Sequence, residues 1–395
     1  MNAIKGRVCV AMSGGVDSAA AAALLVEQGA DCVGVTLRLF CSGETTARAT
    51  ACCSAESTRR AADACELLGI PHMVLDDKAA FRAAVIDPFT DSYVRGETPI
   101  PCAACNSELK FGSLFTQAAE LGATSIATGH YSRIVAGADG TPAIARSHDR
   151  RKDQTYFLWG VERARLARIL FPVGDLTKDE ARDVARRWNL PMADLVESLD
   201  ICFVEGRDYA DVVLDELEAR AEAAGLAPGA LSPLPGPMLD LAGRRVGTHP
   251  GLVHYTVGQR KGLGLTSPDP LYVVALDAAR NAVIVGREGD LQEDRCDVRG
   301  VNWQCAVLGF GESRRVSVQI RYRHQAAAAT VMALDGQRAE VRFDEPQRAI
   351  TPGQSAVFYD GDVLLGGGVI DATPARHRVQ VAWPAKAAGT GVHAE

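Results

Sequence analysis

Through the first half of the chain, segments with the hydrophobic pattern of a buried strand alternate with segments that have the pattern of a helix. Short apolar runs predict buried strands at residues 8–12, 32–39, 72–75 and 125–128. The segments between them predict helices at residues 18–28, 56–68 and 107–121. Thr177 and Glu180 have the spacing of a capping box at the start of another helix. This alternation is typical of an α/β fold with a doubly wound parallel sheet, whose ligands bind at the carboxyl ends of the strands.

The pattern changes in the second half of the chain. Residues 226–237 are rich in Pro, Gly and Ala, which indicates a linker or an irregular loop. Residues 316–323 alternate as a strand with one apolar face, and Asp335-Gly336 and Asp360-Gly361 are hairpin-type turns. We therefore predict a catalytic domain at 1–204, a small central domain at 205–290, an antiparallel β-barrel at 291–384 and a disordered tail at 385–395.

The loop at residues 11–18, Ala-Met-Ser-Gly-Gly-Val-Asp-Ser, carries the clearest chemical signal. It joins a predicted strand to a predicted helix, where glycines allow close approach and free N–H groups bind anions. Ser13 and Ser18 add hydroxyl donors, and Asp17 can orient a hydroxyl or hold a magnesium ion. No lysine follows the glycines, so the loop differs from Walker-type loops and resembles the SGGxDS loop of ATP pyrophosphatases. An ordinary strand-to-helix turn is the alternative.

Composition limits the classes of function. The net charge of −7 means that a nucleic-acid partner must be bound through local basic patches. Two such patches are the basic residues of 146–152 and the pair Arg321 and Arg323. The longest apolar run is far shorter than the ~20 residues that a membrane span needs, so we expect a cytoplasmic protein without a membrane partner. Eleven cysteines in such a protein indicate thiol chemistry or metal binding.

Three cysteines are candidates for that chemistry. Cys102 and Cys105 form a CxxC motif in a proline-containing loop, and Cys202 lies in an Asp-Ile-Cys-Phe segment. We expect Cys105 at or near a helix N-terminus, which would lower the pKa of its thiol. Buried structural cysteines are the alternative. Positions that we assign to the core or to loops are Cys9, Cys32, Cys52, Cys53 and Cys65.

Together these motifs resemble those of the tRNA-specific 2-thiouridylase family over nearly the whole chain. The matching segments are residues 13–18, 98–111 (TPIPCAACNSELKF), 128–131, 152–158, 200–203, 254–264 (HYTVGQRKGLG) and 321–322. The resemblance implies an adenine nucleotide α-hydrolase-like fold and ATP-dependent 2-thiolation of the wobble uridine, position 34, of tRNA. ATP would adenylate the C2 oxygen before sulfur replaces it. The implied partners are tRNA and a sulfur-donating protein, and not DNA.

The resemblance also implies roles for single residues. Cys202 would carry a persulfide, and Cys105 would be the nucleophile that completes the transfer, closing a Cys105–Cys202 disulfide. The contacts to ATP with Mg²⁺ would be Ala11, Met12, Ser13, Gly14, Gly15, Val16, Asp17, Ser18, Leu37 and Gly129. The target base would meet Ile100, Pro101 and Cys102. The other tRNA contacts would be His130, Lys152, Asp153, Gln154, Arg321, Tyr322 and Gln354.

Cys102 departs from the family pattern, because many members have Asp at this position. At neutral pH an aspartate is ionised and a free cysteine is mostly protonated, so Cys102 cannot take over the role of an ion or a general base. Instead Cys102, Cys105 and Cys202 could together hold a [4Fe–4S] cluster with one open iron. Sulfur delivery by a persulfide and delivery by such a cluster both stay open.

Two other functions use the same motifs. An ATP-dependent ligase or amidotransferase shares the SGGxDS loop. A non-enzymatic, redox-responsive or iron–sulfur RNA-binding protein would use the CxxC motif as a sensor. Pyrophosphate or AMP release stimulated by tRNA separates both from a thiouridylase.

Overall fold

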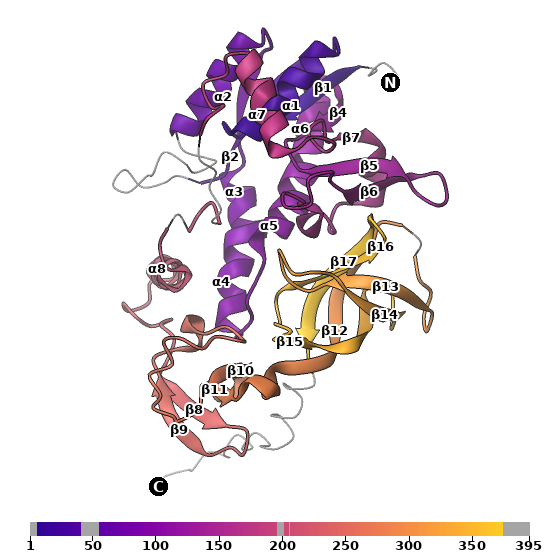
Figure 1. Cartoon of the computed structure of the whole chain (residues 1–395). Coiled ribbons are helices and arrows are strands. Elements are labelled where there is room, and N and C mark those ends of the chain that lie inside the picture. The colour runs from indigo at the N-terminus through magenta and orange to yellow at the C-terminus, as the bar shows by residue number, and fades with distance from the viewer. Residues whose placement is uncertain (1–5, 41–54, 196–200, 205, 306, 374–395) are drawn as a thin grey trace.

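The computed structural model describes residues 6–40, 55–195, 201–204, 206–305 and 307–373 (Figure 1). The Cys52-Cys53 pair, Asp200 and the predicted tail at 385–395 lie outside these residues. Within the described ranges, no helix is both long and apolar enough to cross a membrane.

The first half is built on a five-stranded parallel sheet with the order β3-β2-β1-β4-β7. Its strands are β1 (Arg7–Ala11), β2 (Cys32–Arg38), β3 (His72–Asp76), β4 (Ala123–Ala127) and β7 (Ile169–Leu170). From β1 the chain proceeds through β2 to β3 at one edge of the sheet. It then crosses back to form β4 on the other side of β1. The doubly wound α/β fold is thus confirmed, with its switch point between β1 and β4.

Helices connect and cover these strands (Figure 1). They are α1 (Val16–Glu27), α2 (Ala55–Leu67), α3 (Lys78–Phe81), α4 (Asp87–Val94), α5 (Pro101–Ala104), α6 (Leu114–Glu120) and α7 (Lys178–Arg187). Two π-helical segments, η1 (Arg82–Ile86) and η2 (Cys105–Ser113), make 78–94 and 101–120 nearly continuous helices. The helix at 78–94 was not predicted. The predicted start at 107 was wrong, because Pro101 occupies the first helical position, where proline is favoured.

A smaller mixed sheet, with both parallel and antiparallel pairs, follows the helix α8 (Tyr209–Ala223). It has the order β10-β11-β8-β9. Its strands are β8 (Gly236–Asp240), β9 (Arg245–His249), β10 (Tyr272–Asp277) and β11 (Ala282–Gly286). Of the predicted loop at 226–237, residues 226–235 contain neither helix nor strand, and the last two residues begin β8.

The C-terminal part is a closed antiparallel barrel of six strands. They are β12 (Gln292–Trp303), β13 (Ser313–Gln319), β14 (Ala327–Ala333), β15 (Arg338–Arg348), β16 (Ser355–Asp360) and β17 (Val363–Ala372). Pairing of β12 with β17 closes the barrel, which confirms the predicted barrel and both predicted turns. The strand predicted to reach residue 323 ends at Gln319, and Arg323 has a positive φ of 62° in the turn beyond it.

The first half and the barrel share both a sheet and a core. The hairpin of β5 (Ser132–Ala136) and β6 (Pro142–Arg146) pairs with β17 at Val363 and Ala145. One hydrophobic cluster combines residues of both parts, among them Phe111 and Tyr359. Short 3₁₀ turns complete the structure: η3 (Thr155–Phe157), η4 (Arg163–Arg168), η5 (Leu252–His254), η6 (Ala278–Arg280) and η7 (Glu288–Leu291). The domain boundaries at 204 and 290 stay predictions.

Candidate active site

The loop between β1 and α1 is shaped by its own hydroxyl groups. The Ser18 hydroxyl accepts a hydrogen bond from the Ser13 backbone N–H at 3.2 Å and donates to the Gly15 carbonyl oxygen at 3.0 Å. Gly14 has a φ of +74°, and a Cβ there would collide with the carbonyl oxygen of Ser57 on α2. Glycine at position 14 is therefore required by both conformation and space. It presents the first N–H groups of α1 at the carboxyl end of β1.

Other predicted ATP contacts lie at the same edge of the sheet. Leu37 is near the end of β2 and is 9% exposed. Gly129 follows β4, and a Cβ there would lie 2.5 Å from the backbone nitrogen of Ser18. The loops after β1 and β4 therefore touch at the switch point, where α/β sheets bind ligands.

Two cations that sequence reasoning missed lie beside this loop. Lys178, the first residue of α7, donates from Nζ to Asp17 Oδ1 at 2.6 Å, and its side chain is 8% exposed. The predicted capping box is confirmed, with the Thr177 N–H donating to Glu180 Oε2 at 2.7 Å, and it fixes the start of α7. Arg60 of α2 donates from Nε to the Gly14 carbonyl oxygen at 3.2 Å. Only the capping box gave a sequence signal, and it pointed to a helix start and not to a ligand site.

The CxxC motif lies inside a helix and not before one. Cys102 is the second residue of α5 and is half-buried, and Cys105 begins the π-helical segment η2 and is 8% exposed. Cys105 lies one turn beyond the helix start, near the helix N-terminus as expected, and the first positions of the helix belong to Pro101 and Cys102. Arg165 donates to the carbonyl oxygen of Phe111 within η2. Short π segments inside helices are frequent at functional sites.

Cys202 is brought to the same part of the molecule. It is half-buried and packs against the hydrophobic cluster that contains Cys105. Cys9, Cys32 and Cys65 are buried in strands or helices, as expected. Burial raises the pKa of Cys9 and of Cys65 to about 12, and that of Cys32 to about 11. These core thiols are therefore protonated and unreactive at neutral pH.

The segment before the CxxC motif is bound to the barrel. Gln354 Nε2 donates to the Thr98 carbonyl oxygen at 2.9 Å, and the Thr98 N–H donates to the Pro352 carbonyl oxygen at 2.8 Å. Gly353 has a φ of +91°, and a Cβ there would lie 2.8 Å from the Thr98 nitrogen. The side chain of Glu97 is buried and pairs with Arg299 of β12 at 2.9 Å. The barrel therefore positions the residues that lead into Ile100–Cys102.

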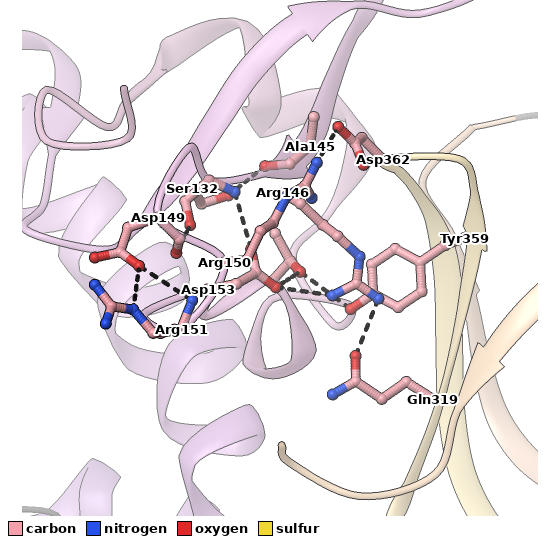
Figure 2. Close-up of polar contacts among 12 residues, drawn as sticks. Ser132, Ala145, Arg146, Asp149, Arg150, Arg151, Asp153, Gln319, Tyr359 and Asp362 are labelled. Carbon is pink, nitrogen blue, oxygen red and sulfur yellow. Dashed lines mark hydrogen bonds and ion pairs between the residues drawn. The ribbon is translucent and has the colours of Figure 1, made fainter. Parts of the chain in front are cut away.

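The predicted basic patch at 146–152 divides into inward and outward side chains (Figure 2). The Arg146 guanidinium lies 3.7 Å from the ring centroid of Tyr359, donates to Asp153 Oδ2 at 3.0 Å and donates to Gln319 Oε1 at 3.1 Å. Asp153 is buried and also accepts from the Ser147 N–H at 2.9 Å. Arg146 is thus part of the contact with the barrel, which corrects its assignment to a phosphate-binding patch.

The outward arginines of this segment are exposed to solvent, although each also pairs with a carboxylate, Arg150 with Asp362 and Arg151 with Asp149 at 3.7 Å. Arg150 pairs with Asp362 at 2.5 Å, and both side chains are about half exposed (Figure 2). The Arg151 side chain is 89% exposed. Gln154 makes a reciprocal pair with Tyr131, because Gln154 Oε1 accepts from the Tyr131 N–H at 2.9 Å and the Gln154 N–H donates back at 3.0 Å.

Comparison with known proteins follows the same division of the chain. The tRNA methyl transferase HUP domain matches residues 6–206, a PRC-barrel domain of the same name matches 229–287, and an aminomethyltransferase β-barrel domain matches 293–370. A tRNA-specific 2-thiouridylase MnmA from Acidithiobacillus ferrooxidans is 46% identical over 93% of this chain and 99% of its own. The chain belongs to the tRNA-specific 2-thiouridylase family.

Further members of the family from other bacteria show similar likeness. The Rhodopseudomonas palustris HaA2 protein is 44% identical over 94% of this chain and 92% of its own, and that of Geobacter metallireducens is 43% identical over 93% and 97%. Among solved structures, an NMN synthetase from Francisella tularensis is 21% identical over 58% of this chain and 80% of that one, with a TM-score of 0.32.

Three further tRNA contacts are implied by the thiouridylase resemblance. His130 belongs to the first half of the chain, and Arg321 and Tyr322 belong to the barrel. His130 is buried beside Phe111 and Phe171, and burial holds the pKa of its imidazole well below the ordinary value. Tyr322 packs on Phe157 with ring centroids 4.5 Å apart. Arg321 donates to the Arg348 carbonyl oxygen at 3.0 Å, and burial lowers the pKa of its guanidinium.

Proposed function

We propose that this chain transfers sulfur to C2 of the wobble uridine, position 34, of tRNA at the expense of ATP. One observation carries the proposal: the chain is 46% identical to a tRNA-specific 2-thiouridylase over 93% of its length. The geometry agrees with it, because the SGGxDS loop and Gly129 meet at one sheet edge, and Cys105 and Cys202 share one hydrophobic cluster.

ATP supplies the activation that this reaction needs. A ring carbonyl oxygen is a poor leaving group until it carries AMP, so the C2 oxygen attacks the α-phosphorus and pyrophosphate leaves. The N–H groups at the start of α1, with Ser13 and Ser18, would bind the pyrophosphate. Magnesium bound to ATP would neutralise phosphate charge. Asp17 already binds Lys178 and Tyr131, so its proposed role is to position the loop.

Sulfur transfer follows from the two cysteines. The terminal sulfur of a Cys202 persulfide attacks C2, and AMP leaves with the former C2 oxygen. The Cys105 thiolate attacks the Cys202 sulfur, the persulfide S–S bond breaks, and its electron pair stays on the sulfur now bound to C2. The resulting Cys105–Cys202 disulfide needs a two-electron thiol reductant, and a sulfur-donating protein must reload Cys202.

Delivery by an iron–sulfur cluster on Cys102, Cys105 and Cys202 is the alternative route. Burial of Cys105 in the hydrophobic cluster that Cys202 also contacts is compatible with both routes. Within the described ranges, no three His, Cys, Asp or Glu side chains are grouped as a metal site. We propose the persulfide route, because Cys105 and Cys202 together can complete it without a further cofactor. Thiolation by Cys102→Asp in an iron-free preparation supports this route, and about four irons per chain that are lost in Cys102→Ala overturn it.

The proposed tRNA contacts separate into direct and supporting residues. We propose that Arg151 and Lys152 bind backbone phosphates, with Arg321 and Tyr322 contacting tRNA from the barrel side. The carboxylate of Asp153 faces Arg146, so its role is to hold this segment in place. Three residues lead to the target base, namely Ile100, Pro101 and Cys102. Three more residues would act from buried or hydrogen-bonded positions, namely His130, Gln154 and Gln354.

The assay that tests the function uses unmodified tRNA, ATP and a persulfide donor under reducing conditions. We expect 2-thiouridine, with AMP and pyrophosphate released in equal amounts and only in the presence of tRNA. Pyrophosphate release driven by a small acid or amine would instead indicate the ligase or amidotransferase. Binding of tRNA without nucleotide turnover would indicate the RNA-binding sensor. The proposed location is the cytoplasm, where tRNA and ATP are available.

A further inference from the structure

Asp17 in the ATP loop is held by two residues from outside the loop. Asp17 Oδ1 accepts hydrogen bonds from Lys178 Nζ at 2.6 Å and from the Tyr131 hydroxyl at 3.0 Å. Both donors are buried, with Lys178 at 7% and Tyr131 at 2% exposure. Charge-assisted hydrogen bonds in such surroundings are strong and directional, so the position of Asp17 depends on both donors.

The two donors are each fixed to the segment at 147–154. The Lys178 N–H donates to Asp149 Oδ2 at 3.3 Å, and Asp149 Oδ1 accepts from the Arg151 N–H at 3.1 Å. Tyr131 is joined to Gln154 by the reciprocal pair described above. Asp149 is 6% exposed and lies at the N-terminus of α7, where the helix dipole favours a negative charge.

This segment also carries basic side chains, of which Arg150 and Arg151 are exposed and Lys152 is half-buried. Arg151 follows Asp149 by two residues, and Lys152 precedes Gln154 by two residues. A phosphate group bound by these basic residues can therefore displace a short segment that is connected at both ends to the same carboxylate oxygen, Asp17 Oδ1. Both connections are made of buried or partly buried hydrogen bonds between named atoms, so a displacement at one end changes the geometry at the other.

We propose that Lys178 and Tyr131 are positioning residues that couple tRNA binding at 147–154 to the ATP loop through Asp17. This inference rests on the proposed function and adds a specific consequence. The loop binds ATP in its productive geometry when tRNA occupies the segment, so ATP is not consumed on an empty enzyme. By thermodynamic linkage, ATP strengthens tRNA binding by the same factor.

The test measures the Kd of α,β-methylene ATP by calorimetry, with and without saturating unmodified tRNA. In the unaltered protein we expect tRNA to tighten nucleotide binding at least about fivefold, the lower end of typical allosteric couplings. In Tyr131→Phe and in Lys178→Met we expect the Kd without tRNA and the Kd with tRNA to differ by less than about twofold. Tyr131→Phe removes only a hydroxyl, so it serves where Lys178→Met does not fold.

A matched control lies at the other end of the same two helices. Arg187 of α7 pairs with Glu27 of α1 at 3.1 Å, far along the helices from the loop. We expect Arg187→Met to keep the coupling of the unaltered protein.

Two results would overturn the proposal. The first is an unaltered protein whose nucleotide affinity is the same with and without tRNA. The second is a pair of variants that keep the full ratio of the two Kd values, either with unchanged affinity or with an affinity that falls equally with and without tRNA, as a purely structural role requires. An unaltered protein that thiolates tRNA without this coupling would contradict only the coupling. Absence of thiolation would contradict the function itself.

Discussion

The carboxamide of Gln354 in the barrel donates to the backbone carbonyl oxygen of Thr98, 2.9 Å away, two residues before the proposed target-base segment. The barrel therefore holds the entrance to the CxxC helix. Removing one neutral hydrogen bond costs about 1 kcal/mol, so we expect Gln354→Ala to lower kcat/KM for tRNA about fivefold. Thiolation kinetics check this value. Gln347→Ala, whose amide bonds only to its own strand through Glu345, should keep the kcat/KM of the unaltered protein. Equal loss in both variants would contradict a specific role for Gln354.

Gly129 is required because its Cα touches the first turn of α1. An added Cβ would lie 2.5 Å from the Ser18 nitrogen, so Gly129→Ala must displace the ATP loop. We expect ATP affinity to fall at least about tenfold, which corresponds to ~1.4 kcal/mol. Gly289→Ala is the control, since nothing lies within 4 Å of its added Cβ. Unchanged ATP affinity in Gly129→Ala would show that nucleotide does not bind at this edge of the sheet.

Arg146 joins the first half of the chain to the barrel through a mostly buried ion pair. Arg146→Met leaves Asp153 buried without its cation, and we expect the free energy of unfolding to fall by about 3 kcal/mol. Urea denaturation measures this loss. Arg342→Met is the comparison, because its pair with Glu340 has an Arg side chain that is 64% exposed, and exposed pairs contribute less than about 1 kcal/mol. A loss below 1 kcal/mol in Arg146→Met would place Arg146 back among the solvent-facing cations.

His130 makes stability depend on pH. Burial holds the pKa of its imidazole well below that of the unfolded chain, so the unfolded state binds more protons as pH falls below about 6.5. Its contribution to stability is thus fully present above that pH and declines toward acid, by up to ~1.4 kcal/mol per pH unit. Denaturation of His130→Gln between pH 7 and pH 5 should show a shallower decline. His148→Gln, at an exposed position, should decline like the unaltered protein, and an unchanged slope in His130→Gln would contradict this account.

Strong local patterns predicted the strands of the parallel sheet and of the barrel. The apolar runs gave β1 to β4, and the alternating strands with their Asp-Gly turns gave the barrel. The helix at 78–94 was missed, because it contains an internal Pro88 and a π-helical segment, η1, that breaks the usual period. Helix start at Pro101 was misplaced, because the proline was interpreted as part of a loop.

Long-range partners account for what the sequence could not show at the site. The roles of Lys178 and Arg146 depend on residues far away in the chain, namely Asp17 and Tyr359. A cluster of arginines predicts a phosphate site equally well whether its side chains face solvent or a neighbouring carboxylate. The acceptors that distinguish the two cases come from the fold and leave no local signal.

The central claim is tested most directly by digesting tRNA after incubation with the purified protein, ATP and a persulfide donor, and measuring its nucleosides by mass spectrometry. We predict 2-thiouridine at position 34, one AMP per sulfur, and no product from Cys202→Ala. A tRNA that gains no sulfur, or gains it equally with Cys202→Ala, would contradict the account.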